Sequence, residues 1–160
     1  MGWGYFMNSY EDLLDDIKQE GINVIELDLD TNKPCGKCIG NTIFINNRIT
    51  NKEKFCVLAE ELGHYKLTVG DITNLKDISN RKQEIKARRW GYEKFVGIMK
   101  IIEAFEKGAR SKYELADYLN VSEYFLDDAI LYYKQKYGVY FEIDNYLVYF
   151  EPTLAIIKQF

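Results

Sequence analysis

The 160-residue sequence predicts a protein of the α+β class, with strand patterns and helical patterns in separate stretches of the chain. Residues 24–29 alternate apolar and charged side chains, and residues 42–46 are rich in β-branched and aromatic ones, as strands are. Residues 51–66 and 80–107 instead have the apolar spacing of helices. With 47% hydrophobic residues, a chain of this length can bury one good core, alone or with a small helical appendage.

The first third of the chain begins with a predicted amphipathic helix and continues into a small sheet. Ser9 is placed to cap the helix and Gly21 to end it. The stretches 24–29 and 42–46 then predict two strands of a short antiparallel sheet. Between them, residues 34–38 read Pro-Cys-Gly-Lys-Cys and predict a turn that leads into the second strand.

The middle of the chain predicts two longer helices, over residues 51–66 and 80–107. In the first helix, apolar side chains share one face, and the polar group discussed below projects elsewhere. The second helix has a break at Gly91 or Gly97, and Gly108 is its natural stop.

The last third predicts a helical unit followed by a β-hairpin. Residues 115–133 are spaced like a helix-turn-helix, but the leading edge of the second helix carries Glu123, Asp127 and Asp128, which DNA phosphates would repel. We therefore interpret this unit as a packing or protein-recognition element. Residues 139–150 alternate around an Asp-Asn turn and predict the hairpin.

Charge and composition limit the classes of partner. The net charge of -4 and the pI of about 5.2 disfavour direct binding of nucleic acid. Residues 81–100 are locally basic, with seven Lys or Arg against two Glu, and form either a solvated helix face, which we favour, or a contact for an acidic partner. No export signal or apolar run long enough for a membrane span is evident. We expect a cytoplasmic protein without a membrane partner.

The chain has three cysteines, an odd number that disfavours a disulfide framework. Cys35 and Cys38 form a C-x-x-C, which occurs in zinc sites and redox pairs, but no second pair completes four sulfur ligands. Cys56 lies in an apolar run and is expected to act as a small buried hydrophobe.

The only histidine belongs to Glu60-Glu61-Leu62-Gly63-His64, the zinc-peptidase pattern H-E-x-x-H with glutamate in place of the first histidine. On a helix, Glu60 and His64 lie about one turn apart on the same face, so both can reach one ion. A carboxylate is a permitted zinc ligand, but it is harder and less selective than imidazole. These residues predict either an altered metal site or an exposed polar helix face.

The stretches 57–65, 68–72 and 81–90 resemble the ImmA/IrrE family of metallopeptidases, most closely the versions carried by prophages and mobile elements of Gram-positive bacteria. The resemblance covers nearly the whole chain, including residues 136–138. In the family pattern, H-E-x-x-H is followed by a helix with E-x-x-A-x-x-aromatic, which here spans residues 84–90.

The resemblance implies a role for each residue of the motif. His64 and Glu84 would be metal ligands, Glu61 the general base, and Glu60 would occupy the place of the first histidine. The implied cofactor is one zinc ion, bound more weakly than by two histidines because of Glu60.

The implied fold is a zincin-like minimal metallopeptidase domain over residues 1–107, with a small sheet and the two motif helices. Residues 108–160 would form the helical unit and terminal hairpin packed on it. Zincins also use a tyrosine or histidine to stabilise the oxyanion. Tyr65 and Tyr92 are both near the motif helices in sequence, and the sequence does not decide between them.

Three functions follow from these observations. The resemblance implies a metal-dependent endopeptidase that cleaves a phage-type helix-turn-helix repressor and so relieves repression of a prophage or mobile element. The alternative is an inactive anti-repressor of the same fold that acts by protein binding. A DNA-binding regulator that uses residues 115–133 is disfavoured by the acidic composition.

Overall fold

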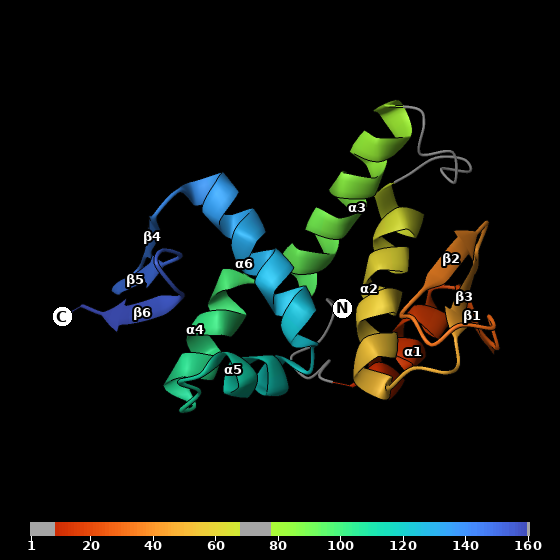
Figure 1. The fold of residues 1–160 in the computed structure, drawn as a ribbon, viewed down its shortest axis with the longest axis horizontal. Coiled ribbons are helices and arrows are strands. Elements are labelled where there is room, and N and C mark those ends of the chain that lie inside the picture. The colour runs from red at the N-terminus through yellow and green to blue at the C-terminus, as the bar shows by residue number, and fades with distance from the viewer. Residues whose placement is uncertain (1–8, 68–77, 160) are drawn as a thin grey trace.

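The computed structural model describes residues 9–67 and 78–159, and over these residues the chain is an α+β protein with six helices and two three-stranded sheets (Figure 1). The α+β prediction is confirmed. The elements in chain order are α1 (Tyr10–Gln19), β1 (Asn23–Leu27), β2 (Gly36–Ile39), β3 (Thr42–Asn46), α2 (Asn51–Leu67), α3 (Ile78–Phe95), α4 (Ile98–Glu106), α5 (Lys112–Leu119), α6 (Glu123–Tyr137), β4 (Tyr140–Ile143), β5 (Tyr146–Tyr149) and β6 (Ala155–Lys158).

The N-terminal sheet differs from the predicted one in the relative direction of two strands and in having a third strand. Its strand order is β1-β3-β2, with β1 parallel to β3 and β2 antiparallel to β3. The predicted antiparallel pairing of the first and last strands is therefore wrong. The reason is an additional strand in the connection: the predicted turn at residues 34–38 contains the start of β2, which turns back at Gly40 and forms a hairpin with β3.

Gly36 allows β2 to lie against both its neighbours. A Cβ atom at this position would be 2.6 Å from the carbonyl oxygen of Phe44 on β3 and 2.8 Å from Cγ1 of Val57 on α2. Both distances are too short for a real Cβ, so only glycine fits here without displacement. The edge strand therefore packs closely on α2, the helix that carries the motif.

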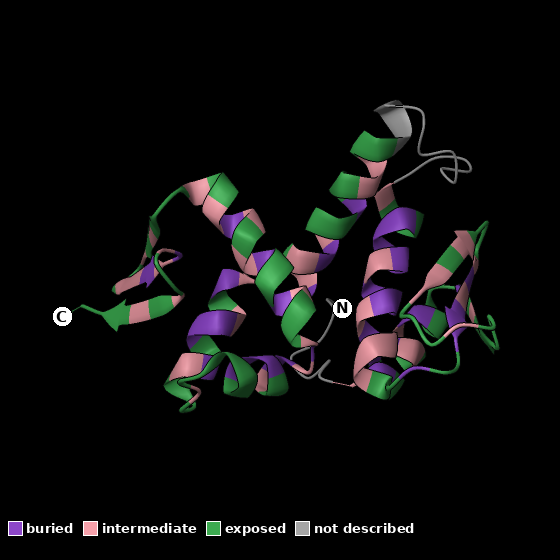
Figure 2. Ribbon diagram, in the orientation of Figure 1, coloured by how far each residue is buried: buried purple, intermediate pink, exposed green. Residues whose placement is uncertain are grey.

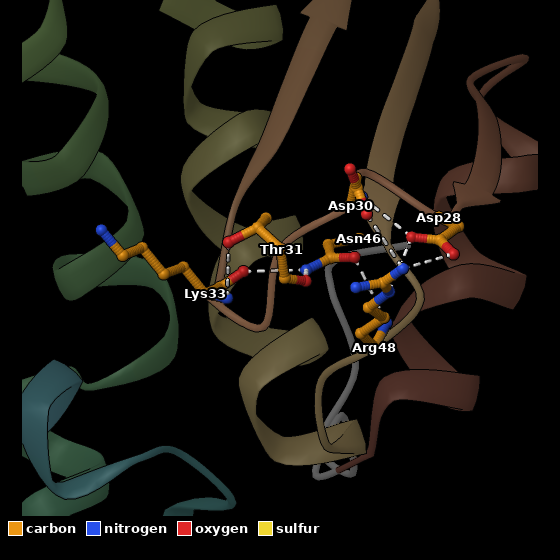
Figure 3. Close-up of polar contacts among 6 residues, drawn as sticks. All are labelled: Asp28, Asp30, Thr31, Lys33, Asn46 and Arg48. Atoms are coloured by element: carbon orange, nitrogen blue, oxygen red, sulfur yellow. Dashed lines mark hydrogen bonds and ion pairs between the residues drawn. The ribbon is translucent and has the colours of Figure 1, made fainter.

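Polar contacts fix the loop that leads from β1 into β2 (Figure 3). The buried side-chain amide of Asn46 donates hydrogen bonds to the carbonyl oxygens of Thr31 at 2.8 Å and Lys33 at 2.9 Å. Arg48 forms an ion pair with Asp28 at 2.7 Å. These contacts connect the loop to the end of β3 and so help to place β2.

Helices α2 and α3 lie side by side at the centre of the molecule (Figure 1). The N-terminal sheet and α1 cover one side of α2, and α3 covers another, so buried residues occur around most of this helix (Figure 2). A Cβ atom at Gly63 would lie 2.4 Å from the carbonyl oxygen of Ala87 on α3. The absence of a side chain at Gly63 lets the two helix backbones approach at this point.

The predicted break in the second long helix is confirmed at Gly97, which separates α3 from α4. Helices α5 and α6 form the predicted helical unit, and each begins at a serine whose hydroxyl accepts a backbone N–H hydrogen bond. The predicted terminal hairpin is β4 and β5, and β6 adds a third strand. One cluster of buried side chains runs from Tyr10 to Phe150. The division of the chain at residue 107 stays a prediction.

None of the helices within residues 9–67 and 78–159 combines the length and the apolar character needed to cross a membrane. Residues 68–72, part of the family resemblance, lie outside the described residues.

Candidate metal centre

Glu60, His64 and Glu84 come together where α2 and α3 pack against each other. One ligand atom from each lies within 4.8 Å of the others, and the His64 Nε2 atom is 3.1 Å from Glu84 Oε1. Glu60 and His64 are one turn apart on α2, as their spacing predicts, and Glu84 comes from α3. His64 is buried with 7% of its surface exposed, and the two glutamates are half-buried. The interpretation of the motif as an exposed polar face is therefore wrong.

The approach of the two helices at Gly63 explains how residues twenty positions apart meet. Gly63 directly precedes His64, and Ala87 is one turn beyond Glu84 on α3. The contact between Gly63 and the Ala87 backbone therefore lies beside the contact between the imidazole and the carboxylate.

Glu61 lies in the same region but is more buried, with 9% of its surface exposed. Burial is the main reason that its pKa rises from 4.5 to about 8, and the negative charges of Glu60 and Glu84 raise it further. A hydrogen bond from the backbone N–H of Cys38 on β2 acts in the opposite direction. The edge strand thus orients the Glu61 carboxyl group. The carboxyl groups of Glu60, Glu61 and Glu84 lie close enough together for their charges to interact.

Arg88 is a member of this site that the sequence analysis did not identify. Its Nε atom donates a hydrogen bond to Glu60 Oε1 at 3.0 Å, and one of its terminal nitrogens is 4.0 Å from Glu84 Oε1. The available signal was its spacing: Glu84, Arg88 and Tyr92 follow one another at intervals of four and share one face of α3. The guanidinium group therefore supplies a positive charge next to two of the three carboxylates.

The two candidate tyrosines differ in their surroundings. Tyr65 is 36% exposed on α2. Tyr92 is half-buried and packs its ring edge-on against Phe125 of α6, with ring centres 5.3 Å apart. Burial raises the Tyr92 pKa to about 12, and the charges of Asp128, Arg88 and Glu60 also act on it. Tyr92 is thus electrostatically connected to the Glu60 side of the site.

The cysteine thiols are not members of the group formed by Glu60, His64 and Glu84. All three thiols are free, and among the residues that the structure describes only Glu60, His64 and Glu84 form a group that could hold a metal ion. Burial raises the pKa of Cys56 to about 11, in agreement with the expectation of a small hydrophobe.

The donor set fits a divalent metal ion. One imidazole nitrogen and two carboxylates provide three protein ligands, the number found in catalytic zinc sites, which keep a further position open for water or substrate. Two ligand atoms of a tetrahedral zinc ion, each about 2.0–2.2 Å from it, are about 3.4 Å apart. The separation of 3.1 Å between His64 Nε2 and Glu84 Oε1 is close to that value.

A motif helix with glutamate and histidine, a second helix that supplies a glutamate, and a small sheet whose edge strand packs beside them define the zincin-like class of metallopeptidase fold. The profile of the IrrE N-terminal-like domain, Peptidase_M78, matches residues 17–131. The chain belongs to this family, the ImmA/IrrE metallopeptidases, and the family suggests a metal-dependent peptidase. No curated protein and no solved structure matched the chain.

Proposed function

We propose that the protein is a zinc-dependent endopeptidase in which Glu60, His64 and Glu84 hold the ion and Glu61 is the general base. The observation that carries this proposal is the grouping of the three ligand atoms within 4.8 Å, with the buried Glu61 carboxyl group beside them. The family supports a metal-dependent peptidase, and the donor set supports a single divalent ion.

A zinc ion bound here would polarise the carbonyl group of the scissile peptide bond and lower the pKa of a water molecule. Glu61 then takes the proton of the attacking water and transfers it to the leaving amine. In the metal-free chain the raised pKa of about 8 favours the protonated form of the Glu61 carboxyl group at neutral pH. A nearby cation favours the ionised form that a base requires. Tyr92 is a better candidate than Tyr65 for contact with the oxyanion, because the charge of Glu60 acts on the Tyr92 hydroxyl group.

The proposed substrate is a phage-type repressor with a helix-turn-helix domain, cut at one or a few peptide bonds in the cytoplasm. Such selectivity needs contacts away from the metal, and the acidic face of α6 is a candidate surface. Asp127 is exposed and forms an ion pair with Lys112 at 3.1 Å, whereas the charges of Arg88 and Glu60 act on Asp128. Asp127→Lys therefore tests recognition with less effect on the metal site, and it should weaken cleavage. Unchanged kinetics would exclude this surface.

The second candidate is an anti-repressor that binds the same kind of target without cutting it. The observation that favours it is the ion pair between Glu60 and Arg88, because a guanidinium group already contacts the residue that stands in the place of the first histidine. Under this interpretation the helices provide a binding surface and no metal is required.

Two experiments separate these functions. Elemental analysis of protein purified without chelators or a metal-affinity tag should find close to one zinc per chain, and the metal should be lost in His64→Ala. Glu61→Gln should then abolish cleavage of a repressor encoded nearby while preserving binding to it, since the amide keeps the shape of the side chain but cannot act as a base. If Glu61→Gln relieves repression to the same extent as the wild type without cutting the repressor, the anti-repressor function would be supported.

A further inference from the structure

Arg88 is the only cationic side chain among residues 9–67 and 78–159 that the structure shows in contact with two of the proposed metal ligands. It projects from α3 toward α2, and its Nε atom donates to Glu60 Oε1 at 3.0 Å. Its Nη2 atom is 4.0 Å from Glu84 Oε1, the same oxygen that lies 3.1 Å from His64 Nε2. The guanidinium group therefore hydrogen-bonds one proposed ligand, Glu60, and lies at ion-pair distance from a second, Glu84.

A divalent ion and this guanidinium group need the same negative charges. An ion held by Glu60 and Glu84 would lie a few ångströms from Arg88, and like charges at that distance repel. The ligand atoms also span up to 4.8 Å, more than the roughly 3.4 Å between ligand atoms on one tetrahedral zinc ion. Because His64 and Glu84 are already close, most of the closure falls to Glu60, the residue that Arg88 holds.

Arg88 has space to move and a second carboxylate near it. Its side chain is 52% exposed, so the guanidinium group can rotate away from Glu60 on the solvent side. Asp128 on α6 is the alternative partner, because the positive charge of Arg88 already acts on it. A move of the guanidinium group from Glu60 toward Asp128 would leave both ligands free for the ion and keep Arg88 compensated.

We propose that Arg88 is an internal cation that competes with the divalent ion for Glu60 and Glu84, so that the strength of the Glu60–Arg88 contact sets the metal affinity of the site. This inference rests on the metal site of the proposed function. The opposite possibility is that Arg88 positions Glu60 from behind, as residues around metal ligands often do, in which case its removal would weaken metal binding. The two roles predict changes of opposite sign.

The test compares Arg88→Gln with Arg89→Gln as a matched control. Arg89 is the next residue on α3 and is also exposed, but its guanidinium group lies over the ring of Tyr132, with its central carbon 5.4 Å from the ring centre. Both variants lose one positive charge, and only the first loses the contact with Glu60. Each protein is stripped with a chelator, checked for fold by circular dichroism, and titrated with zinc chloride in a calorimeter.

Competition predicts that Arg88→Gln binds zinc about tenfold more tightly than the wild type, or about 1.4 kcal/mol, and that Arg89→Gln binds like the wild type. Zinc should also raise the melting temperature of Arg88→Gln more than that of the wild type. In a Glu60→Gln background, the gain from Arg88→Gln should shrink, because the competition acts through Glu60.

Equal or weaker zinc binding by Arg88→Gln would overturn the inference and leave the proposed metal site in place. If Arg88→Gln binds zinc and neither the wild type nor Arg89→Gln does, the competition would be supported. The metal dependence proposed for the wild-type protein would then be refuted. Absence of zinc binding in every variant would overturn both.

Discussion

Replacement of Glu61 by glutamine should change how the stability of the metal-free protein depends on pH. Burial and the neighbouring carboxylates raise the Glu61 pKa from 4.5 to about 8 in the folded chain. Between these two pH values the unfolded chain has released the proton and the folded chain still holds it. Because the folded state binds more protons there, the free energy of unfolding falls as pH rises.

The magnitude follows from the size of the shift. Each pKa unit corresponds to about 1.36 kcal/mol, so the loss accumulated between about pH 4.5 and about pH 7 is about 3 kcal/mol, as an upper limit. The contribution of Glu61 to the free energy of unfolding is fully present below the unfolded-state pKa of 4.5. It is lost as pH rises through the folded-state pKa of about 8. The amide of Glu61→Gln stays neutral throughout and still offers a carbonyl oxygen to the backbone N–H of Cys38.

The assay is urea unfolding in the presence of a chelator at a series of pH values from about 5 to about 8. Glu61→Gln should match the wild type at the acidic end and become more stable than it by about 2–3 kcal/mol near neutral pH. Glu142→Gln, which removes an exposed carboxylate on β4, is the control and should follow the wild type. Parallel profiles for wild type and Glu61→Gln would refute the assignment of a raised pKa to Glu61.

The remaining predictions concern helix packing, the core and the proposed metal. Gly63→Ala should lower the free energy of unfolding by about 2–3 kcal/mol, because its Cβ would lie 2.4 Å from a backbone oxygen of α3. At Gly91 the nearest atom to an added Cβ is 3.5 Å away, so Gly91→Ala should lower the melting temperature far less than Gly63→Ala does. Tyr133→Phe should cost about 1 kcal/mol in urea unfolding, since it removes a buried hydrogen bond of 2.9 Å to the Val96 carbonyl oxygen; an unchanged midpoint would contradict this. Zinc titration in weak buffer should release a proton from the wild type near neutral pH and fewer from Glu61→Gln; equal release would exclude Glu61 as its source.

The sequence predicted the types of most elements because periodic apolar patterns report directly on which faces become buried. It missed β2 for a physical reason. Of its four residues, only Ile39 is β-branched, and Gly36 disfavours a strand, so the local sequence has a weak strand preference. The strand forms because it pairs with β3 and because Gly36 fits against Val57, and both contacts are tertiary.

The candidate site was predictable only as far as helix spacing and family resemblance reach. Glu60 and His64 are four residues apart, and helix geometry alone predicts that they share a face. The location of Glu84 beside them depends on the packing of two helices, and without the resemblance no pattern would connect it to His64. Arg88 stands one turn after Glu84, but its choice of Glu60 as partner is a contact between helices that sequence spacing does not encode.

The C-terminal helices bear on the candidate site as well as on the core. Tyr92 packs against Phe125 of α6, and the charges of Arg88 and Glu60 act on Asp128 of the same helix. The family profile extends to residue 131, well into α6, and the buried core continues beyond it. A helix that both supports α3 and offers a carboxylate to Arg88 can influence which partner Arg88 contacts. A repressor bound to the acidic face of α6 would therefore act on the same charges that, in our proposal, control access of the metal to Glu60.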